Sequence, residues 1–288
     1  MTSEFREQYG PWAFIAGASM GIGAALSHEA AARGLNVVMM ARGEAKLNEA
    51  AAEVRERNGV EVRAVVGDLA SPDIGQVVAD ATNDLEIGLF VYNATIALQG
   101  KFLDVEVSEQ LASVAVNCAT PIILTNLLGK PMAARGRGGI ALVSSMGGLQ
   151  GSINFGTYNA GKAFEWVLAE TLWAELREVG VDAITIFVGA TSSPNYLLFQ
   201  ETLDPELCTR TDTDDPLDRA RSRLMNPSTP EEVALALYDQ IGDGPVCFTH
   251  PDDAWVAEQV FKRSRREAVE IWTGVQETPT RMATHTAR

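Results

Sequence analysis

The sequence is poor in the residues that build metal centres and disulfide frameworks. Neither its cysteines nor its histidines have the spacing of metal ligands. The three of each kind are scattered along the 288-residue chain: Cys118, Cys208, Cys247, His28, His250 and His285. We therefore expect no metal site, and cysteines that serve packing in a reducing compartment.

Positive charge and long apolar runs are also scarce. The chain has 23 Lys and Arg against 38 Asp and Glu, a formal net charge of -15. Nucleic acids and anionic membranes select basic surfaces, so neither is expected as a partner. No uninterrupted apolar run reaches the ~20 residues that span a bilayer. Residues 1–11 are polar and lack the apolar centre of a signal peptide. We expect a cytoplasmic protein.

The rest of the sequence alternates between strand and helix patterns. Apolar runs predict strands at 12–16, 35–41, 60–66, 87–92, 140–143, 181–188 and 246–249. Helical patterns fall between and after them, at 24–33, 44–57, 72–82, 108–128 (with Ser108 as N-cap), 154–179, 229–241 and 252–272. This alternation predicts an α/β fold, a doubly wound, mostly parallel sheet of about seven strands with helices on both faces. Without a linker or repeat, residues 1–288 are expected to form a single domain.

One segment, residues 190–225, interrupts the alternation. It contains no predicted strand, three prolines and a cluster of aspartates. Long insertions in compact domains are commonly lids or binding loops. Because it includes the apolar stretch 196–199, we interpret it as a substrate-covering segment; a disordered surface loop is the alternative. Residues 252–288 are expected to form a C-terminal helix and tail.

A glycine-rich loop follows the first predicted strand. Residues 17–23 read Gly-Ala-Ser-Met-Gly-Ile-Gly and lead into the first predicted helix. Glycines let the backbone approach a pyrophosphate, while the helix N-terminus supplies N–H donors and a positive dipole. This context predicts a dinucleotide site, and we expect the contacts to come from Gly17, Ser19, Met20, Gly21, Ile22 and Gly23.

A second signal is the pair Tyr158 and Lys162 within the predicted helix 154–179. Four residues apart, they share one helix face. An ammonium beside a phenol favours the ionised phenol and so makes it a better general acid or base. The pair predicts proton transfer to or from a substrate.

With these motifs in this order, the chain resembles the short-chain dehydrogenase/reductase family. Residues 16–23 are similar to the family's T-G-x-x-x-G-I-G, with Ala16 in place of Thr. Asp68-Leu69 resembles the acid-apolar pair that contacts adenine. Residues 92–95 resemble N-N-A-G, with Asn93-Ala94 intact. Residues 188–193 resemble P-G-x-x-x-T and add Gly189 and Ser193 to the cofactor site.

The resemblance implies a Rossmann-type fold and a catalytic tetrad of Asn117, Ser145, Tyr158 and Lys162. Tyr158 would give a proton to the carbonyl oxygen, and Ser145 would hydrogen-bond that oxygen. Lys162 would hold the nicotinamide ribose, and Asn117 would bind a water linking Lys162 to solvent. Ser144, beside Ser145, leaves the choice of serine open.

Cofactor choice is predicted at the end of the second strand. An acid there would bind the ribose hydroxyls of NAD, but the chain has Ala41 followed by Arg42. Arg42 can make a charge-assisted contact with a 2′-phosphate, so NADP(H) is expected over NAD(H). The alternative is that Arg42 points into solvent or pairs with a carboxylate such as Glu44.

The expected substrate is a hydrophobic or aromatic ketone, or its alcohol. Apolar residues surround the predicted site, whereas neither of the stretches 163–176 and 188–199 contains Lys or Arg. The candidate pocket residues are Met146, Leu149, Ile153, Phe155, Tyr196, Leu197 and Phe199.

The sequence thus predicts an NADP-dependent oxidoreductase that interconverts a ketone and a secondary alcohol. A non-catalytic dinucleotide-binding regulator is one alternative, although it would have no need of a proton donor. A nucleotide-sugar epimerase or dehydratase shares the Tyr/Lys pair but has a larger C-terminal substrate domain. Surplus apolar residues on helices 108–128 and 154–179 predict a homodimer or homotetramer.

Overall fold

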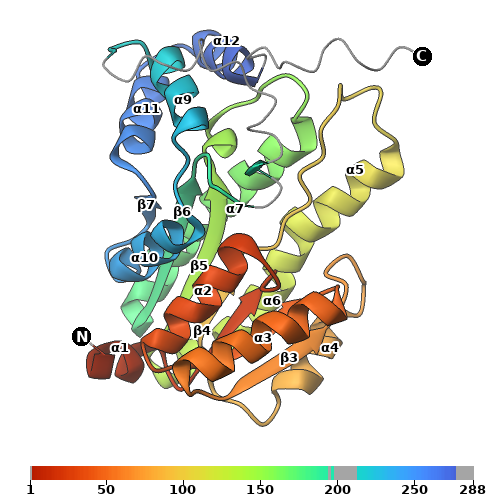
Figure 1. Ribbon diagram of the computed structural model, residues 1–288, viewed down its shortest axis with the longest axis vertical. Helices are drawn as coiled ribbons and strands as arrows, with labels where there is room; N and C mark the ends of the chain where they lie inside the picture. Colours follow the sequence, from red (N-terminus) through yellow and green to blue (C-terminus); the bar gives the residue numbers. More distant parts are fainter. Residues whose placement is uncertain (1, 194–195, 198–212, 277–288) are drawn as a thin grey trace.

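The computed structural model describes residues 2–193, 196–197 and 213–276, and it is built on one parallel sheet of seven strands (Figure 1). The strand order is β3-β2-β1-β4-β5-β6-β7. This confirms the predicted fold class. The strands are β1 (Trp12–Ala16), β2 (Asn36–Ala41), β3 (Val62–Val66), β4 (Ile87–Tyr92), β5 (Gly138–Ser145), β6 (Val181–Val188) and β7 (Val246–Phe248).

Helices connect the strands and cover both faces of the sheet (Figure 1). The first half contains α1 (Thr2–Tyr9), α2 (Gly21–Ala32), α3 (Glu44–Asn58), α4 (Ile74–Thr82), α5 (Val107–Val114), the π-helical turn η1 (Ala115–Ala119) and α6 (Thr120–Arg135). The second half contains η2 (Met146–Leu149), α7 (Gly156–Leu176), η3 (Arg177–Val179), α9 (Pro216–Met225), α10 (Pro230–Gln240), α11 (Pro251–Phe261) and α12 (Arg265–Gln276).

Alternate residues of each strand enter two separate apolar cores. In β1, Ala13 and Ile15 pack with α2, α3 and α10, whereas Phe14 and Ala16 pack with α4, α6 and α7. Strands buried on both faces must be apolar at every position, which explains why the sequence shows continuous runs rather than alternation.

A third apolar core lies beyond the carboxyl ends of β5, β6 and β7. There α9, α11 and α12 gather against η2 and Phe187, at the top of Figure 1. The helix α1 lies at the opposite side, by the amino ends of the strands, where it contacts β4 and β5. The C-terminal helices therefore lie at the carboxyl ends of the strands, the side of the sheet on which the glycine loop after β1 also lies.

The predicted helix 108–128 is wrong in its start, its end and its continuity. It begins at Val107, after Glu106, with no side-chain cap, so Ser108 is not the N-cap. It widens into η1 and continues as α6 to Arg135. The proline at position 121 explains the irregular turn, because it lacks the N–H that would bond to the carbonyl of Asn117 in a regular α-helix.

By length and composition alone, the segment Val107–Arg135 is apolar enough to cross a membrane. Polar residues interrupt this segment, so it contains no uninterrupted apolar run of the length expected for a membrane span. In the structure, Leu124, Leu128 and Met132 are buried against the sheet. Core helices of this kind pass the same test.

The predicted helix 252–272 is two helices, α11 and α12. The Ser264 backbone N–H and hydroxyl both donate to the Glu267 carboxylate, and the Glu267 N–H donates back to the Ser264 hydroxyl. This capping box starts a new helix. Two further helices were not predicted, α1 and α9, and α9 lies inside the segment 190–225.

Candidate active site

The glycine loop forms a cradle at the start of α2. Gly17 and Gly21 have positive φ values of 82° and 54°, which favour glycine. A Cβ on Gly23 would lie 1.9 Å from the Gly17 carbonyl oxygen, so only glycine lets the helix approach the loop. Met20, the N-cap residue, gives the helix no side-chain cap. The first turn of α2 therefore keeps N–H donors for an anion.

The loop after β4 joins this cradle to η1. The Asn93 side chain donates to the Gly17 carbonyl over 3.0 Å. The Thr95 hydroxyl and the Ile96 N–H both donate to the Asn117 side-chain oxygen, over 3.2 and 3.0 Å. The strand order of the sheet reverses between β1 and β4. Dinucleotides bind at this point in doubly wound folds.

The Asn117 side chain is fully buried and fully used. In addition to the two bonds it accepts, its amide donates to the Ile96 carbonyl and the Ser113 hydroxyl. The Asn117 side chain therefore has no hydrogen-bonding capacity left for a water. The predicted water itself stays a prediction.

Asp68 and Leu69 lie after β3, as the sequence indicated. Asp68 is exposed and accepts a bond from the Ala70 N–H over 3.0 Å. The Leu69 carbonyl accepts the Thr120 hydroxyl over 2.6 Å, which ties this loop to α6. Contact of either residue with adenine stays a prediction.

Arg42 is exposed directly after β2. Within the described residues it makes no ion pair, with Glu44 or with any other carboxylate. The alternative of an ion pair between Arg42 and Glu44 therefore has no support in the structure. The Arg42 guanidinium is available for a phosphate.

The structure distinguishes the two neighbouring serines at the end of β5. Ser144 is buried, and its hydroxyl donates to the Lys162 carbonyl over 2.7 Å. Ser145 is half-buried, and its hydroxyl oxygen accepts from the Gly147 N–H over 3.2 Å. Ser145 is therefore the more accessible of the two serines, and its contact with a substrate stays a prediction.

Tyr158 and Ser145 both lie beside Gly147. A Cβ on Gly147 would lie 3.5 Å from Tyr158 Cε1 and 3.6 Å from Ser145 Oγ. The Tyr158 ring packs edge-on against Phe155, with ring centroids 6.1 Å apart. Among the described residues no group bonds to the Tyr158 hydroxyl, which leaves it free for a substrate oxygen.

Lys162 is held in the interior. Its ammonium donates to the Val143 carbonyl over 2.7 Å and to the Glu165 carboxylate over 2.8 Å. Lys162 is 3% exposed and Glu165 0%. Glu165 was not predicted from the sequence, where its signal is a lone acidic residue between the apolar neighbours Phe164 and Trp166. Contact of Lys162 with the nicotinamide ribose stays a prediction.

The loop after β6 is tied to the C-terminal helices. A Cβ on Gly189 would lie 2.6 Å from a carboxylate oxygen of Asp253, on α11. The Ser193 hydroxyl accepts from the Tyr196 N–H over 3.3 Å, and the Tyr196 hydroxyl donates to the Leu224 carbonyl on α9 over 2.7 Å. Cofactor contacts at Gly189 and Ser193 stay predictions.

The predicted substrate-pocket residues differ in exposure. Met146 and Leu149, 4% and 2% exposed, are packed into the third core, and their contact with a substrate stays a prediction. Phe155 and Tyr196 are half-buried. Phe199 lies outside the described residues. The remaining candidates are the half-buried Ile153 and the exposed Leu197.

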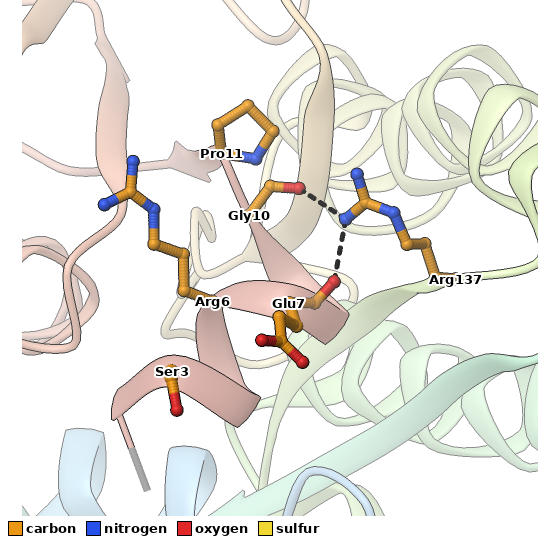
Figure 2. Close-up of a pocket in the computed structure, with 6 residues that line it drawn as sticks. All are labelled: Ser3, Arg6, Glu7, Gly10, Pro11 and Arg137. Carbon is orange, nitrogen blue, oxygen red and sulfur yellow. Dashed lines mark hydrogen bonds between the residues drawn. The ribbon is translucent and has the colours of Figure 1, made fainter.

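A separate hollow lies at the other edge of the sheet, between α1 and the start of β5 (Figure 2). The Arg137 guanidinium crosses it and donates to the Glu7 and Gly10 carbonyls, each over 2.9 Å (Figure 2). Arg137 precedes β5, whereas Ser145 ends it, so this hollow is remote from Tyr158. Arg137 anchors α1, and the hollow has no part in the predicted chemistry.

Comparison with known proteins identifies the family. The family model described as short chain dehydrogenase matches residues 11–201. The chain belongs to the short-chain dehydrogenase family. It is similar to a 7β-hydroxysteroid dehydrogenase of Collinsella aerofaciens, with 38% identity over 192 residues, 67% of this chain and 73% of the relative. The family and such relatives make it an NAD(P)-dependent oxidoreductase.

Solved structures agree with this assignment. One from a study of 7β-hydroxysteroid dehydrogenase stereoselectivity has a TM-score of 0.83 and 31% identity, covering 94% of this chain and 99% of the other. Another is a suggested NAD(P)-dependent gluconate 5-dehydrogenase from Beutenbergia cavernae, with bound NADP at low occupancy. It has a TM-score of 0.73 and 25% identity and covers 86% of this chain and 98% of the other.

Proposed function

We propose that this short-chain dehydrogenase uses NADP(H) to interconvert a ketone and a secondary alcohol on a steroid or another rigid, apolar ring system. The observation that carries the proposal is that Ser145 Oγ and the Tyr158 ring both lie beside Gly147, beyond the carboxyl end of β5. This neighbourhood supports a substrate oxygen that both hydroxyls hydrogen-bond, next to Lys162 on the same helix as Tyr158.

The residues present fit a dinucleotide. The uncapped first turn of α2 and the glycines around it would hold the pyrophosphate, and Arg42 would hold a 2′-phosphate. When bound, the nicotinamide gives or accepts the hydride. The relative with bound NADP supports this choice of cofactor.

Side chains of this protein transfer the proton and stabilise the charge on the substrate oxygen. In the direction of reduction, the Tyr158 hydroxyl donates its proton to the carbonyl oxygen as the carbon is reduced. In the direction of oxidation, the phenolate takes the proton back. The Ser145 hydroxyl donates a hydrogen bond to the same oxygen and stabilises the charge that develops there.

The substrate class rests on apolar surroundings and on the relatives. The Phe155 ring beside Tyr158 offers an apolar face, and the half-buried Ile153 lies in the same connection between η2 and α7. Relatives named for 7β-hydroxysteroids and 17β-hydroxysteroids act on alcohols of fused rings. A flat apolar substrate suits such a site.

The experiment is a panel of ketones assayed by the oxidation of NADPH. The panel contains 7-oxo and 17-oxo steroids, an aromatic ketone, a small aliphatic ketone and a charged 2-oxo acid. We expect the highest kcat/KM with an oxosteroid and the lowest with the 2-oxo acid. Preference for the aliphatic ketone or the 2-oxo acid would contradict the proposed substrate class.

A further inference from the structure

Lys162, which the sequence predicted, forms a buried ion pair with Glu165, which it did not. The two side chains come from the same face of α7, three residues apart, and their charged atoms are 2.8 Å apart. The Val143 carbonyl of β5 accepts a second bond from Lys162. An ammonium has three donors, so these two bonds leave one N–H of Lys162 for another partner.

Burial gives the pair energetic importance. A buried ammonium is costly unless a carboxylate or strong acceptors surround it. Glu165 supplies the charge, and within the described residues its second oxygen, Oε1, has no hydrogen-bond partner. That carboxylate is therefore committed to Lys162 alone.

We propose that Glu165 is a positioning residue, which holds the Lys162 ammonium in place and orients its remaining N–H towards the cofactor. The inference rests on the proposed function in one respect, that Lys162 binds the cofactor. Glu165 itself does not touch substrate or cofactor; it acts through Lys162.

The titration of Glu165 makes this role depend on pH. Burial raises the pKa of Glu165 to about 7, and the charge of Lys162 and its hydrogen bond oppose that rise. The other titratable groups that face Glu165 are Tyr92 on β4 and Cys118 on η1. Both are neutral near pH 7, since the burial and the charge of Glu165 raise the pKa of each. Lys162 is thus the charged group that the carboxylate contacts when Glu165 ionises.

Glutamine at position 165 imitates the protonated carboxyl at every pH. Below the pKa of Glu165, the Glu165→Gln variant and the wild type should therefore behave alike. Above it, only the wild type has the carboxylate that stabilises the ammonium. The loss of one charge-assisted hydrogen bond corresponds to about tenfold in affinity, so the two proteins should differ by about that factor above the pKa of Glu165.

The test measures the dissociation constant of NADPH by fluorescence titration between about pH 6 and about pH 9, on either side of the pKa of Glu165. We expect equal constants for wild type and Glu165→Gln at the acidic end and about tenfold weaker binding by the variant at the alkaline end. The matched control is Glu175→Gln, the same change at an exposed position of α7, which should follow the wild type throughout.

A ratio of dissociation constants that does not change with pH would overturn the proposal, whether the ratio is near one or far from it. The pH profile of kcat/KM for ketone reduction should show the same divergence. If the wild type reduces no ketone, the proposed function fails, while the NADPH titration still decides the role of Glu165.

A second variant and a measurement on the wild type guard against misfolding. Glu165→Asp keeps a carboxylate beside the Lys162 ammonium, and it should bind NADPH more tightly than Glu165→Gln over the same alkaline range. In wild-type protein with ¹³C-labelled glutamate carboxyls, NMR should show one carboxyl that titrates near pH 7. The absence of such a carboxyl would also overturn the proposal.

Discussion

Gly23 lies directly against the carbonyl oxygen of Gly17, so that a Cβ on Gly23 would be only 1.9 Å from that oxygen. The contact fixes the start of α2 on the glycine loop. It also gives the most severe steric test of the predicted cofactor site.

Gly23→Ala should therefore displace the loop from α2 and weaken NADPH binding by at least about tenfold, roughly the loss of one charge-assisted hydrogen bond. Calorimetric titration with NADPH measures the effect. Gly242→Ala is the matched control, because its Cβ would meet only the Tyr9 hydroxyl at an ordinary 3.7 Å. Equal affinity of both variants would show that the loop does not bind the dinucleotide.

Arg42→Ala should erase most of the preference for NADPH over NADH. The exposed Arg42 makes no ion pair within the described chain, so its charge is free for a 2′-phosphate. A charge-assisted contact of this kind is worth on the order of 1.5–3 kcal/mol, or about ten- to a hundredfold in affinity. The measurement is kcat/KM for both cofactors, with Arg57→Ala, an exposed arginine on α3, as the control. A wild type that prefers NADH would refute the role of Arg42.

Glu165 should make the free energy of unfolding depend on pH. Its pKa rises from 4.5 to about 7 on burial, so between these values the folded protein binds the extra proton and stability falls as pH rises. Glu165→Gln lacks this titration. The stability of wild type relative to the variant should thus decrease over that range, by on the order of 3 kcal/mol.

Denaturant unfolding at several pH values measures this difference, with Glu175→Gln as the control. A difference that is constant, or that grows as pH rises, would mean that Glu165 is not the titrating group.

An exposed apolar face on α5, α6 and α7 should mediate a homodimer or homotetramer. Leu111, Ile122 and Val167 are exposed on these helices. We expect Leu111→Glu combined with Val167→Glu to favour the 30.9 kDa monomer, because charge opposes burial of this face. Leu235→Glu, at an exposed position of α10, should leave the assembly intact. Light scattering that shows only monomer in the wild type would contradict this prediction.

The sheet and much of the site could be predicted from the sequence because their signals are local. Continuous apolar runs such as Ile87–Tyr92 arise only where both faces of a strand are buried. The spacing of Gly17, Gly21 and Gly23 reflects backbone positions that exclude a side chain. The four-residue spacing of Tyr158 and Lys162 requires only a helix.

The features that could not be predicted depend on tertiary contacts or on weaker local signals. Glu165 looks like an ordinary charged helix residue until Lys162 is seen to turn inward. The burial of Met146 by α9, α11 and α12 could not be predicted either, because these helices come from the far end of the chain. The break before α12 had a local signal, the Ser264–Glu267 capping box, and the prediction of one helix overlooked it.

The central claim is that Tyr158 is the general acid of ketone reduction. The most direct measurement is the single-turnover rate of NADPH oxidation by Tyr158→Phe, with the best ketone of the panel and the dissociation constant of NADPH determined alongside. Tyr9→Phe is the matched control, because it removes a hydroxyl that bonds Asp182 near the opposite edge of the sheet. The account predicts a loss of about 10²–10⁴-fold in rate with unchanged NADPH affinity for Tyr158→Phe, and a wild-type rate for Tyr9→Phe. Near-wild-type turnover by Tyr158→Phe would contradict it.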